Sequence, residues 1–220
     1  MKHYTYIDLF SGAGGLSLGF GNAGFELEFA NDIAKEALET FRHNLRISHP
    51  LLSSDRIIQG DIIELYEHLG TSKVENKSLG YITVETDREV SLRKKAPIVR
   101  GDSDINSFLA KIDSVDILAG GPPCQGFSMI GRSKKASVEE RMKGFVDDPR
   151  NQLFRYFLKF AEKLNPKIVL IENVKGLGSA SSYRDLIEES LKKTGTGYIV
   201  SSEVLNAKDY GLAQHRERLF

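Results

Sequence analysis

The sequence is short of cysteine, of net charge and of long hydrophobic runs, and each shortage excludes a class of protein. Cys124 is the only cysteine among 220 residues, so the chain can hold neither an internal disulfide nor a cysteine-rich metal site. Lys and Arg together number 30, as do Asp and Glu, whereas a freestanding DNA-binding module is usually basic. We therefore expect any contact with nucleic acid to be local, or to depend on a basic part elsewhere.

The absence of long apolar runs bears on location. No stretch approaches the roughly 18 apolar residues of a membrane span, and the N-terminus has no apolar run long enough for a signal peptide. We expect no membrane partner and a reducing, cytoplasmic compartment. Hydrophobic residues make up 40% and charged residues 27%, which is typical of a folded globular chain large enough for one α/β domain.

Apolar runs of strand length alternate with helical patterns along most of the chain, which predicts a doubly wound, Rossmann-like α/β fold with a mostly parallel sheet. Two polar stretches interrupt the alternation: 71–100, which we interpret as an insertion, and 129–150, which resembles a long loop. The chain ends in RERLF, whose last residues resemble the start of a strand, so we expect a single domain over 1–220 that is truncated or forms half of a split protein. The predicted strands are 4–10, 25–30, 56–62, 115–119, 168–172 and 198–206. One helix is predicted from apolar residues at helical spacing between 34 and 41, and three more are predicted over 105–112, 151–164 and 183–194.

A glycine-rich turn, DLFSGAGGLSLGF at 8–20, separates the first strand from its helix. Such a turn lets a ligand approach the backbone closely, although small residues there can also serve packing alone. Asp32 follows the second strand, 20 residues after Gly12, where an acidic residue of a doubly wound fold binds ribose hydroxyls. The alternative is that Asp32 caps the next helix, and the two roles are compatible.

Three further motifs follow predicted strands. GGPPCQGFS, at 120–128, places Cys124 at a strand end, where a lone thiol can be a nucleophile or an inert buried side chain. In IENV, at 171–174, Glu172 emerges from an apolar strand, so it is either a proton donor or the partner of a lysine. In QHRER, at 214–218, Arg216 and Arg218 share one face of an extended segment and suit a base carbonyl or a phosphate, unless the segment is a solvated strand.

Together these motifs resemble the cytosine-C5 DNA methyltransferase family. The resemblance covers nearly the whole chain except the stretch near 71–100, and NAKDYGLAQHRERLF is close to the family pattern throughout. It implies a Rossmann-like catalytic domain, S-adenosyl-L-methionine as methyl donor, S-adenosyl-L-homocysteine as product and double-stranded DNA as substrate. It implies no metal.

The resemblance also implies a role for individual residues. The family's cofactor residues correspond to Phe10, Gly12, Gly14 and Leu16 at the methionine side, Asp32 at the ribose, Ile33 and Asp61 at the adenine, and the neighbouring Ile62 and Pro122. For the adenine contact Asp102 has the better spacing, whereas the RIIQGDI context favours Asp61. In the implied reaction the Cys124 thiolate adds to C6 of a flipped cytosine, Glu172 stabilises N3 and the exocyclic amine, and Arg218, helped by Arg216, holds O2.

The sequence departs from the family after Phe220, since nothing there supplies a target-recognition region or the last two motifs. We therefore expect the chain alone to be weak or inactive, with a C-terminal half or partner chain carrying DNA recognition, and a bacterial restriction-modification role as the setting. Three alternatives remain: methylation of tRNA, a non-catalytic subunit of a split enzyme, and a nicotinamide-dependent oxidoreductase. The last would leave the Cys124, Glu172 and QHRER motifs without a role.

Overall fold

The computed structural model describes residues 4–48, 54–69, 108–123, 152–175 and 181–220. A five-stranded sheet forms its centre, with strand order β3-β2-β1-β4-β5 and every neighbouring pair parallel. This order confirms the predicted doubly wound fold, and the chain reverses its direction of winding between β1 and β4. The strands are β1 Thr5–Leu9, β2 Glu26–Asp32, β3 Ile57–Gln59, β4 Ile117–Gly120 and β5 Ile168–Ile171.

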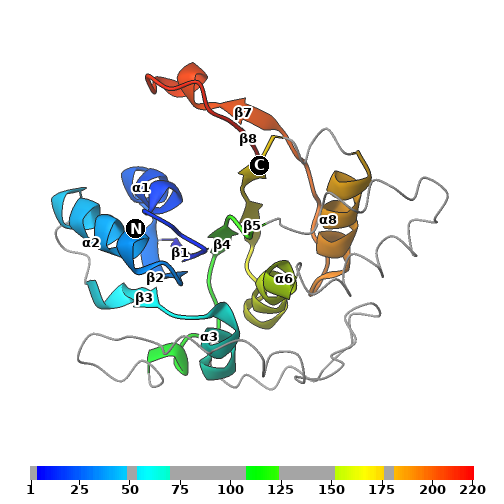
Figure 1. The fold of residues 1–220 in the computed structure, drawn as a ribbon. Helices are drawn as coiled ribbons and strands as arrows, with labels where there is room; N and C mark the ends of the chain where they lie inside the picture. Colours follow the sequence, from blue (N-terminus) through cyan, green and yellow to red (C-terminus); the bar gives the residue numbers. More distant parts are fainter. Residues whose placement is uncertain (1–3, 49–53, 70–107, 124–151, 176–180) are drawn as a thin grey trace.

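Helices cover both faces of this sheet (Figure 1). The helices are α1 Gly15–Asn22, α2 Lys35–Ser48, α3 Ile62–His68, α6 Gln152–Leu164 and α8 Ser181–Lys193. Apolar side chains of α1 and α2, among them Phe20 and Phe41, pack on one face of the sheet. Those of α3 and α6 pack on the other face, and α8 packs against α6.

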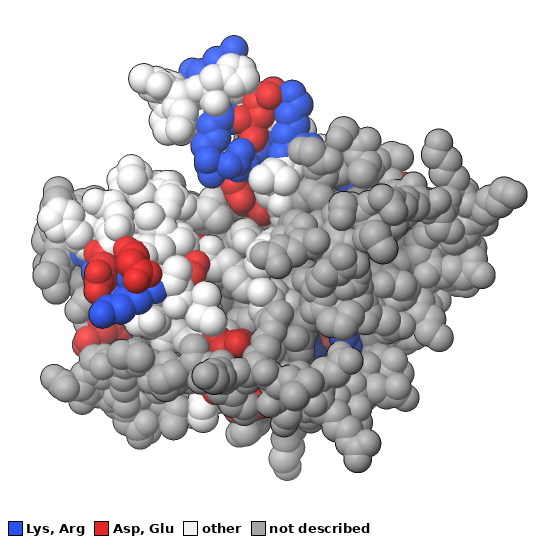
Figure 2. Space-filling view, viewed as in Figure 1, with Lys and Arg blue, Asp and Glu red and all other residues white. Residues whose placement is uncertain are grey.

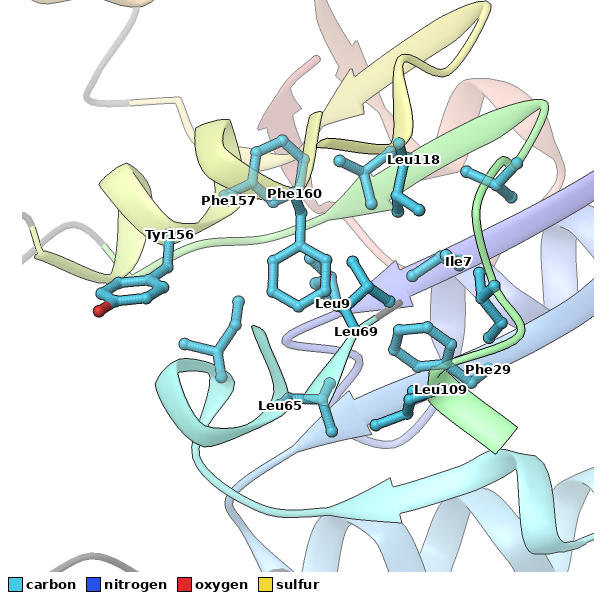
Figure 3. Packing of buried hydrophobic residues seen from close by; sticks show 14 of the residues in the cluster. Ile7, Leu9, Phe29, Leu65, Leu69, Leu109, Leu118, Tyr156, Phe157 and Phe160 are labelled. Atoms are coloured by element: carbon cyan, nitrogen blue, oxygen red, sulfur yellow. The ribbon is translucent and has the colours of Figure 1, made fainter. Parts of the chain in front are cut away.

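The largest core cluster lies between the sheet and the pair α3–α6 (Figure 3). Ile7 and Leu9 of β1 point into this cluster, while Tyr6 belongs to the cluster on the opposite face. Because side chains alternate along a strand, Asp8 shares the Tyr6 face, beneath α1. The α6 helix is buried on two sides, since Phe157 joins the main cluster and Phe154 packs towards α8.

A second, three-stranded antiparallel sheet has the order β6-β8-β7. It consists of β6 Asn173–Val174, β7 Val204–Asn206 and β8 Glu217–Leu219, and the 3₁₀ helix η5 Ala207–Tyr210 follows β7. Only Glu172 separates β6 from β5, so this sheet begins where the central strand ends. In Figure 1 the sheet and η5 project from the body on the side of α1.

The boundaries of several elements differ from the predicted ones. The strand predicted over 56–62 ends at Gln59, because the Asp61 carboxylate accepts a hydrogen bond from Ile63 N at 2.9 Å and caps α3, a helix that the periodicity did not reveal. The strand predicted over 198–206 is confined to β7, although Glu203 and Phe220 exchange two backbone hydrogen bonds. The stretch 71–100, the loop 129–150 and residues 105–107 of the helix predicted over 105–112 lie outside the described residues; of the remainder of that helix only 108–109 are helical, and 110–111 form a turn.

Candidate active site

A cavity of about 680 Å³ lies at the carboxyl ends of three parallel strands. Its walls include the turn after β1, Gly121 after β4 and Glu172 after β5, together with residues of the small sheet and η5. This is the edge at which open α/β sheets bind ligands, next to the point where the winding reverses. Six of the predicted site residues line the cavity: Phe10, Gly12, Leu16, Glu172, Arg216 and Arg218.

The glycine-rich turn has an unusual backbone. Phe10 has a positive φ of 58°, which is uncommon for a residue with a side chain, and Gly12 and Gly14 have φ of 53° and 86°. Gly14 precedes α1, and a Cβ atom there would lie 2.6 Å from Cγ of Phe41, so only glycine fits between the turn and α2. Gly14 therefore acts through packing and does not line the cavity, whereas Gly12 and Leu16 do.

Asp32, at the end of β2, holds this turn in place. Its Oδ2 accepts a hydrogen bond from Gly12 N at 2.8 Å, and its Oδ1 accepts one from Ala34 N at 2.9 Å. The second bond closes an Asx turn ahead of α2, and it is not the helix cap considered from the sequence, because α2 begins at Lys35 and a cap accepts from amides of the first turn. The first bond joins β2 to the glycine-rich turn. The next residue, Ile33, is 56% exposed although it is apolar.

The cavity wall contains one charged residue that the sequence did not identify as functional, Asp8 of β1. Asp8 is fully buried, its Oδ2 accepts a hydrogen bond from Ser17 Oγ at 2.6 Å, and its Oδ1 has no partner among the described residues. Burial raises the pKa of this carboxyl to about 7, although the Ser17 hydrogen bonds oppose the shift. An aspartate inside the apolar run YTYIDLF was the signal available in the sequence.

Glu172 and Arg218 form an ion pair in the cavity wall. Arg218 Nε donates to Glu172 Oε1 at 2.9 Å, and each side chain is about a quarter exposed, at 23% and 24%. The sequence considered a lysine partner for Glu172, and the structure supplies an arginine. A second bond, from an Arg218 Nη1 to the Glu217 carbonyl at 2.8 Å, fixes the plane of the guanidinium group.

Arg216 reaches the same cavity because of a bracing contact in the small sheet. The Asn206 Oδ1 accepts hydrogen bonds from Arg216 N at 3.2 Å and Lys208 N at 3.3 Å, which ties the two ends of the 206–216 connection together. Glu217, one residue along, instead pairs with Lys175 at 2.8 Å. The predicted shared face of Arg216 and Arg218 is confirmed, and Figure 2 shows basic side chains gathered on this projecting part.

Glu172 also lies against the segment that leads to Cys124. A Cβ atom on Gly121 would lie 3.1 Å from Glu172 Oε2, so the two approach closely, and Asn173 Nδ2 donates to the Pro122 carbonyl at 3.2 Å. The IENV motif thus touches the start of GGPPCQGFS, as the proximity of parallel strand ends requires. Cys124 itself, like Asp102, lies outside the described residues.

None of the predicted ribose- and adenine-side residues lines the cavity; these are Asp32, Ile33, Asp61, Ile62 and Pro122. Asp61 caps α3, and Ile62 is 3% exposed within the main core. Among the described residues no group of His, Cys, Asp or Glu is arranged to hold a metal ion. In the same part of the chain, no helix combines the length and apolar character needed to cross a membrane.

Comparison with known proteins gives matches along almost the entire chain. A family model described as "C-5 cytosine-specific DNA methylase" matches residues 4–71 and 89–220. Residues 72–88, which separate the two matched stretches, fall inside the predicted insertion at 71–100.

Curated relatives include the type II methyltransferase M1.HphI of Haemophilus parahaemolyticus, which is 33% identical over 98% of this chain and 44% of its own length. The type II methyltransferase M.AgeI of Thalassovita gelatinovora is 35% identical over 97% of this chain and 38% of its own length. The chain therefore spans about two fifths of the length of these relatives.

Solved structures share the fold. One is a proposed DNA modification methyltransferase encoded within a prophage (E. coli), with a TM-score of 0.59 and 27% identity over 98% of this chain and 45% of that one. The S. pombe Dnmt2 methyltransferase has a TM-score of 0.55 and 19% identity, covering 99% of this chain and 49% of its own, which shows a shared fold alone.

Proposed function

Because the chain belongs to the C-5 cytosine-specific DNA methylase family, we propose that it contributes the catalytic and cofactor-binding part of an enzyme that methylates C5 of cytosine in double-stranded DNA. The single observation that supports this most is the meeting of Glu172, Arg216 and Arg218 in one cavity whose opposite wall is the glycine-rich turn. Three motifs that are far apart in the sequence thereby share one site.

The cavity fits S-adenosyl-L-methionine in size and in chemistry. Ligand sites in proteins are commonly about 300–1,000 Å³, and this one is about 680 Å³. The two buried side-chain atoms without a hydrogen-bond partner in the described part of the chain, Asp8 Oδ1 and Ser11 Oγ, both belong to residues lining the cavity. Buried polar atoms usually have partners, so a polar ligand group suits this position.

In this proposal Phe10, Gly12 and Leu16 form the methionine side of the cofactor site, and Gly14 shapes the turn through its packing on Phe41. Asp32 and Ile33 hold the ribose and adenine. Asp61, Ile62 and Pro122 complete the adenine side. The cofactor supplies an electrophilic methyl group. The exposed apolar side chain of Ile33 suits contact with a base, while Asp32 would have to share its oxygens between the ribose and two backbone amides.

The protein's own residues overcome the low nucleophilicity of cytosine C5. The Cys124 thiolate adds to C6, Glu172 donates a hydrogen bond or proton at N3, and Arg218 and Arg216 face the negative charge that develops at O2. S-adenosyl-L-methionine, held at the glycine-rich turn, would supply the methyl group to C5 through cleavage of its S–CH3 bond and leave as S-adenosyl-L-homocysteine. Loss of the C5 proton to a solvent base and departure of the Cys124 thiolate would then leave 5-methylcytosine. Because both faces of the ring are used, the base leaves the DNA stack.

The geometry of the Glu172–Arg218 pair suits these separate roles at N3 and O2 of the base. One carboxylate oxygen is held by Arg218, and the other lies on the Gly121 side, towards the segment that carries Cys124. A guanidinium group has five N–H donors, and the contacts of Arg218 with Glu172 and with the Glu217 carbonyl use two of them, so other donors can meet a carbonyl oxygen.

A calorimetric titration with S-adenosyl-L-homocysteine, with NADH as control, tests the cofactor assignment. Binding of S-adenosyl-L-homocysteine alone is the expected result, and binding of NADH alone would favour an oxidoreductase and refute the proposal.

A trapping experiment tests the chemistry. DNA with 5-fluorocytosine cannot lose a proton from C5, so after methyl transfer Cys124 cannot leave, and a covalent complex accumulates even when turnover is slow. The complex should form with the unaltered protein and with Asp113→Asn, an exposed carboxylate, and should be absent with Cys124→Ser. A complex that forms only with tRNA would replace the DNA substrate, and an unchanged yield with Cys124→Ser would refute the mechanism.

A further inference from the structure

Asn173 is a buried polar residue for which the proposed chemistry gives no role. It is 8% exposed, follows Glu172 directly, and pairs in β6 with Leu219 of β8. Its Nδ2 donates a hydrogen bond to the Pro122 carbonyl at 3.2 Å, and its Oδ1 accepts one from Val174 N at 2.8 Å. The side-chain amide therefore joins the small sheet to the segment that follows β4.

The Pro122 carbonyl lies where the neighbouring backbone offers few donors. Pro122 and Pro123 have no N–H group, and the Glu172 N–H is already used by the Gly120 carbonyl at 2.9 Å. Pro122 is buried, and a buried carbonyl without a donor is costly. Asn173 supplies a donor that the two consecutive prolines cannot.

The direction of this carbonyl controls where the chain goes next. The proline rings fix φ at both positions, and a residue that precedes proline is restricted in ψ. Peptide bonds do not rotate freely. Once the Pro122 carbonyl is oriented, ψ of Pro123 is therefore the one soft torsion left before the Cα atom of Cys124.

The same strand end holds the rest of this segment. Glu172 N donates to the Gly120 carbonyl, and Glu172 Oε2 lies against Gly121, where an added Cβ would be 3.1 Å from it. Asn173 adds Pro122 as the third consecutive residue of the segment to be held. Two adjacent residues therefore tie the chain that leads to the thiol to the carboxylate with which the thiol works.

We propose that Asn173 is a positioning residue for the nucleophile: its amide orients the Pro122 carbonyl and so directs the backbone towards the place where the Cys124 thiol meets the base. This inference rests on the proposed function, because it takes Cys124 as the nucleophile. Asn173 does not line the cavity, so its effect passes through the backbone of the segment after β4 and not through contact with base or cofactor.

The rate of covalent complex formation with 5-fluorocytosine DNA, at saturating DNA and S-adenosyl-L-methionine, measures this positioning. Asn173→Ala removes the donor, and Asn173→Asp keeps the shape but turns an acceptor towards the Pro122 carbonyl. Because misplacing a reacting group by about 1 Å can cost about 100-fold, the saturating rate should fall by about 10- to 100-fold in both variants. The DNA concentration at half the maximal rate and the affinity for S-adenosyl-L-homocysteine should stay unchanged.

The aspartate variant gives a readout that loss of packing would not move. A protonated carboxyl can donate its O–H to this carbonyl, whereas an ionised one cannot, and burial raises the pKa of a carboxyl. The rate of Asn173→Asp relative to the unaltered protein at the same pH should therefore rise as the pH falls from about 8 to about 5.5, while the relative rate of Asn173→Ala stays constant. The ionisable groups on the adjoining strands are paired and are the same in both variants: Glu172 with Arg218, and Lys175 with Glu217.

Thr194→Val, just after α8, is the matched control, since it removes a fully buried hydroxyl that donates to the Ser190 carbonyl at 2.8 Å. It should lower stability and leave the saturating rate unchanged. If the Asn173 variants form the complex at the unaltered rate, or lose rate equally at every pH, this inference is wrong and the proposed function stands. If the unaltered protein forms no complex with DNA, the proposed function fails and this inference fails with it.

Discussion

Gly14 is the residue at which the geometry of the glycine-rich turn is most constrained, and replacing it with alanine measures that constraint. Its φ of 86° lies in the left-handed region, and an added Cβ would lie 2.6 Å and 2.7 Å from two carbons of the Phe41 ring. Phe41 is 2% exposed in the core beneath α2, so its ring cannot swing away into solvent.

Two terms make up the expected loss of stability. A left-handed backbone costs an alanine about 1–2 kcal/mol, and forcing an extra methyl group into a packed core costs about 1–3 kcal/mol. Alanine also reduces the entropy of the unfolded chain, which offsets about 0.4–1 kcal/mol. The free energy of unfolding of Gly14→Ala should therefore fall by about 2–4 kcal/mol, a large part of the total for a typical domain.

Urea unfolding followed by circular dichroism measures the change, and two further glycines in the same region separate its causes. Gly12 has a φ of 53° and open space around an added Cβ, so Gly12→Ala should show the backbone term alone, about 1 kcal/mol. Gly19 lies inside α1 with open space around it, so Gly19→Ala should stabilise by up to about 1 kcal/mol. If Gly14→Ala costs no more than Gly12→Ala, contact with Phe41 does not limit this turn.

Three other predictions concern stability. The raised pKa of Asp8, about 7 when folded against 3.8 as the ordinary value, means that the folded state binds the proton more tightly, so stability should fall by up to about 4 kcal/mol as the pH rises from about 4 to 7. Asp8→Asn should abolish that fall in urea titrations across this range, and an unchanged pH profile would contradict the burial argument. Asp32→Asn leaves one acceptor oxygen for two backbone amides, so it should lower the free energy of unfolding by about 1–2 kcal/mol in the same assay. An unchanged free energy of unfolding would contradict the role of Asp32 in holding the turn. Phe157 has no exposure in the main core, so Phe157→Ala should lower the free energy of unfolding by about 3–5 kcal/mol. Ile199 is fully exposed, so Ile199→Ala should change it by less than about 0.5 kcal/mol. Similar effects at both positions would contradict the assignment of the core.

Local pattern was sufficient for much of the fold. The alternation of apolar strands and amphipathic helices predicted the doubly wound sheet, because each signal depends on residues close in sequence. The same reasoning extended the third strand to Ile62, since RIIQGDI is apolar throughout, and it missed α3, which begins with the Asp61 cap. A short helix with buried residues on several sides has no clear periodicity, so only the capping bond distinguishes it.

The sequence by itself determined the fold class, the family and the motifs that contain Glu172, Arg216 and Arg218. Glycine turns, strand ends and motif spacing each depend on residues that are close in the sequence. Only the tertiary structure decided that Arg218 pairs with Glu172, that Gly14 packs on Phe41, and that Asp8 is a buried acid at the cavity. Each of these contacts depends on which strands become neighbours and on which side chains are shielded from solvent. Parallel strands far apart in the chain bring their carboxyl ends together, and burial then sets the charge of a side chain that in the sequence is simply an aspartate.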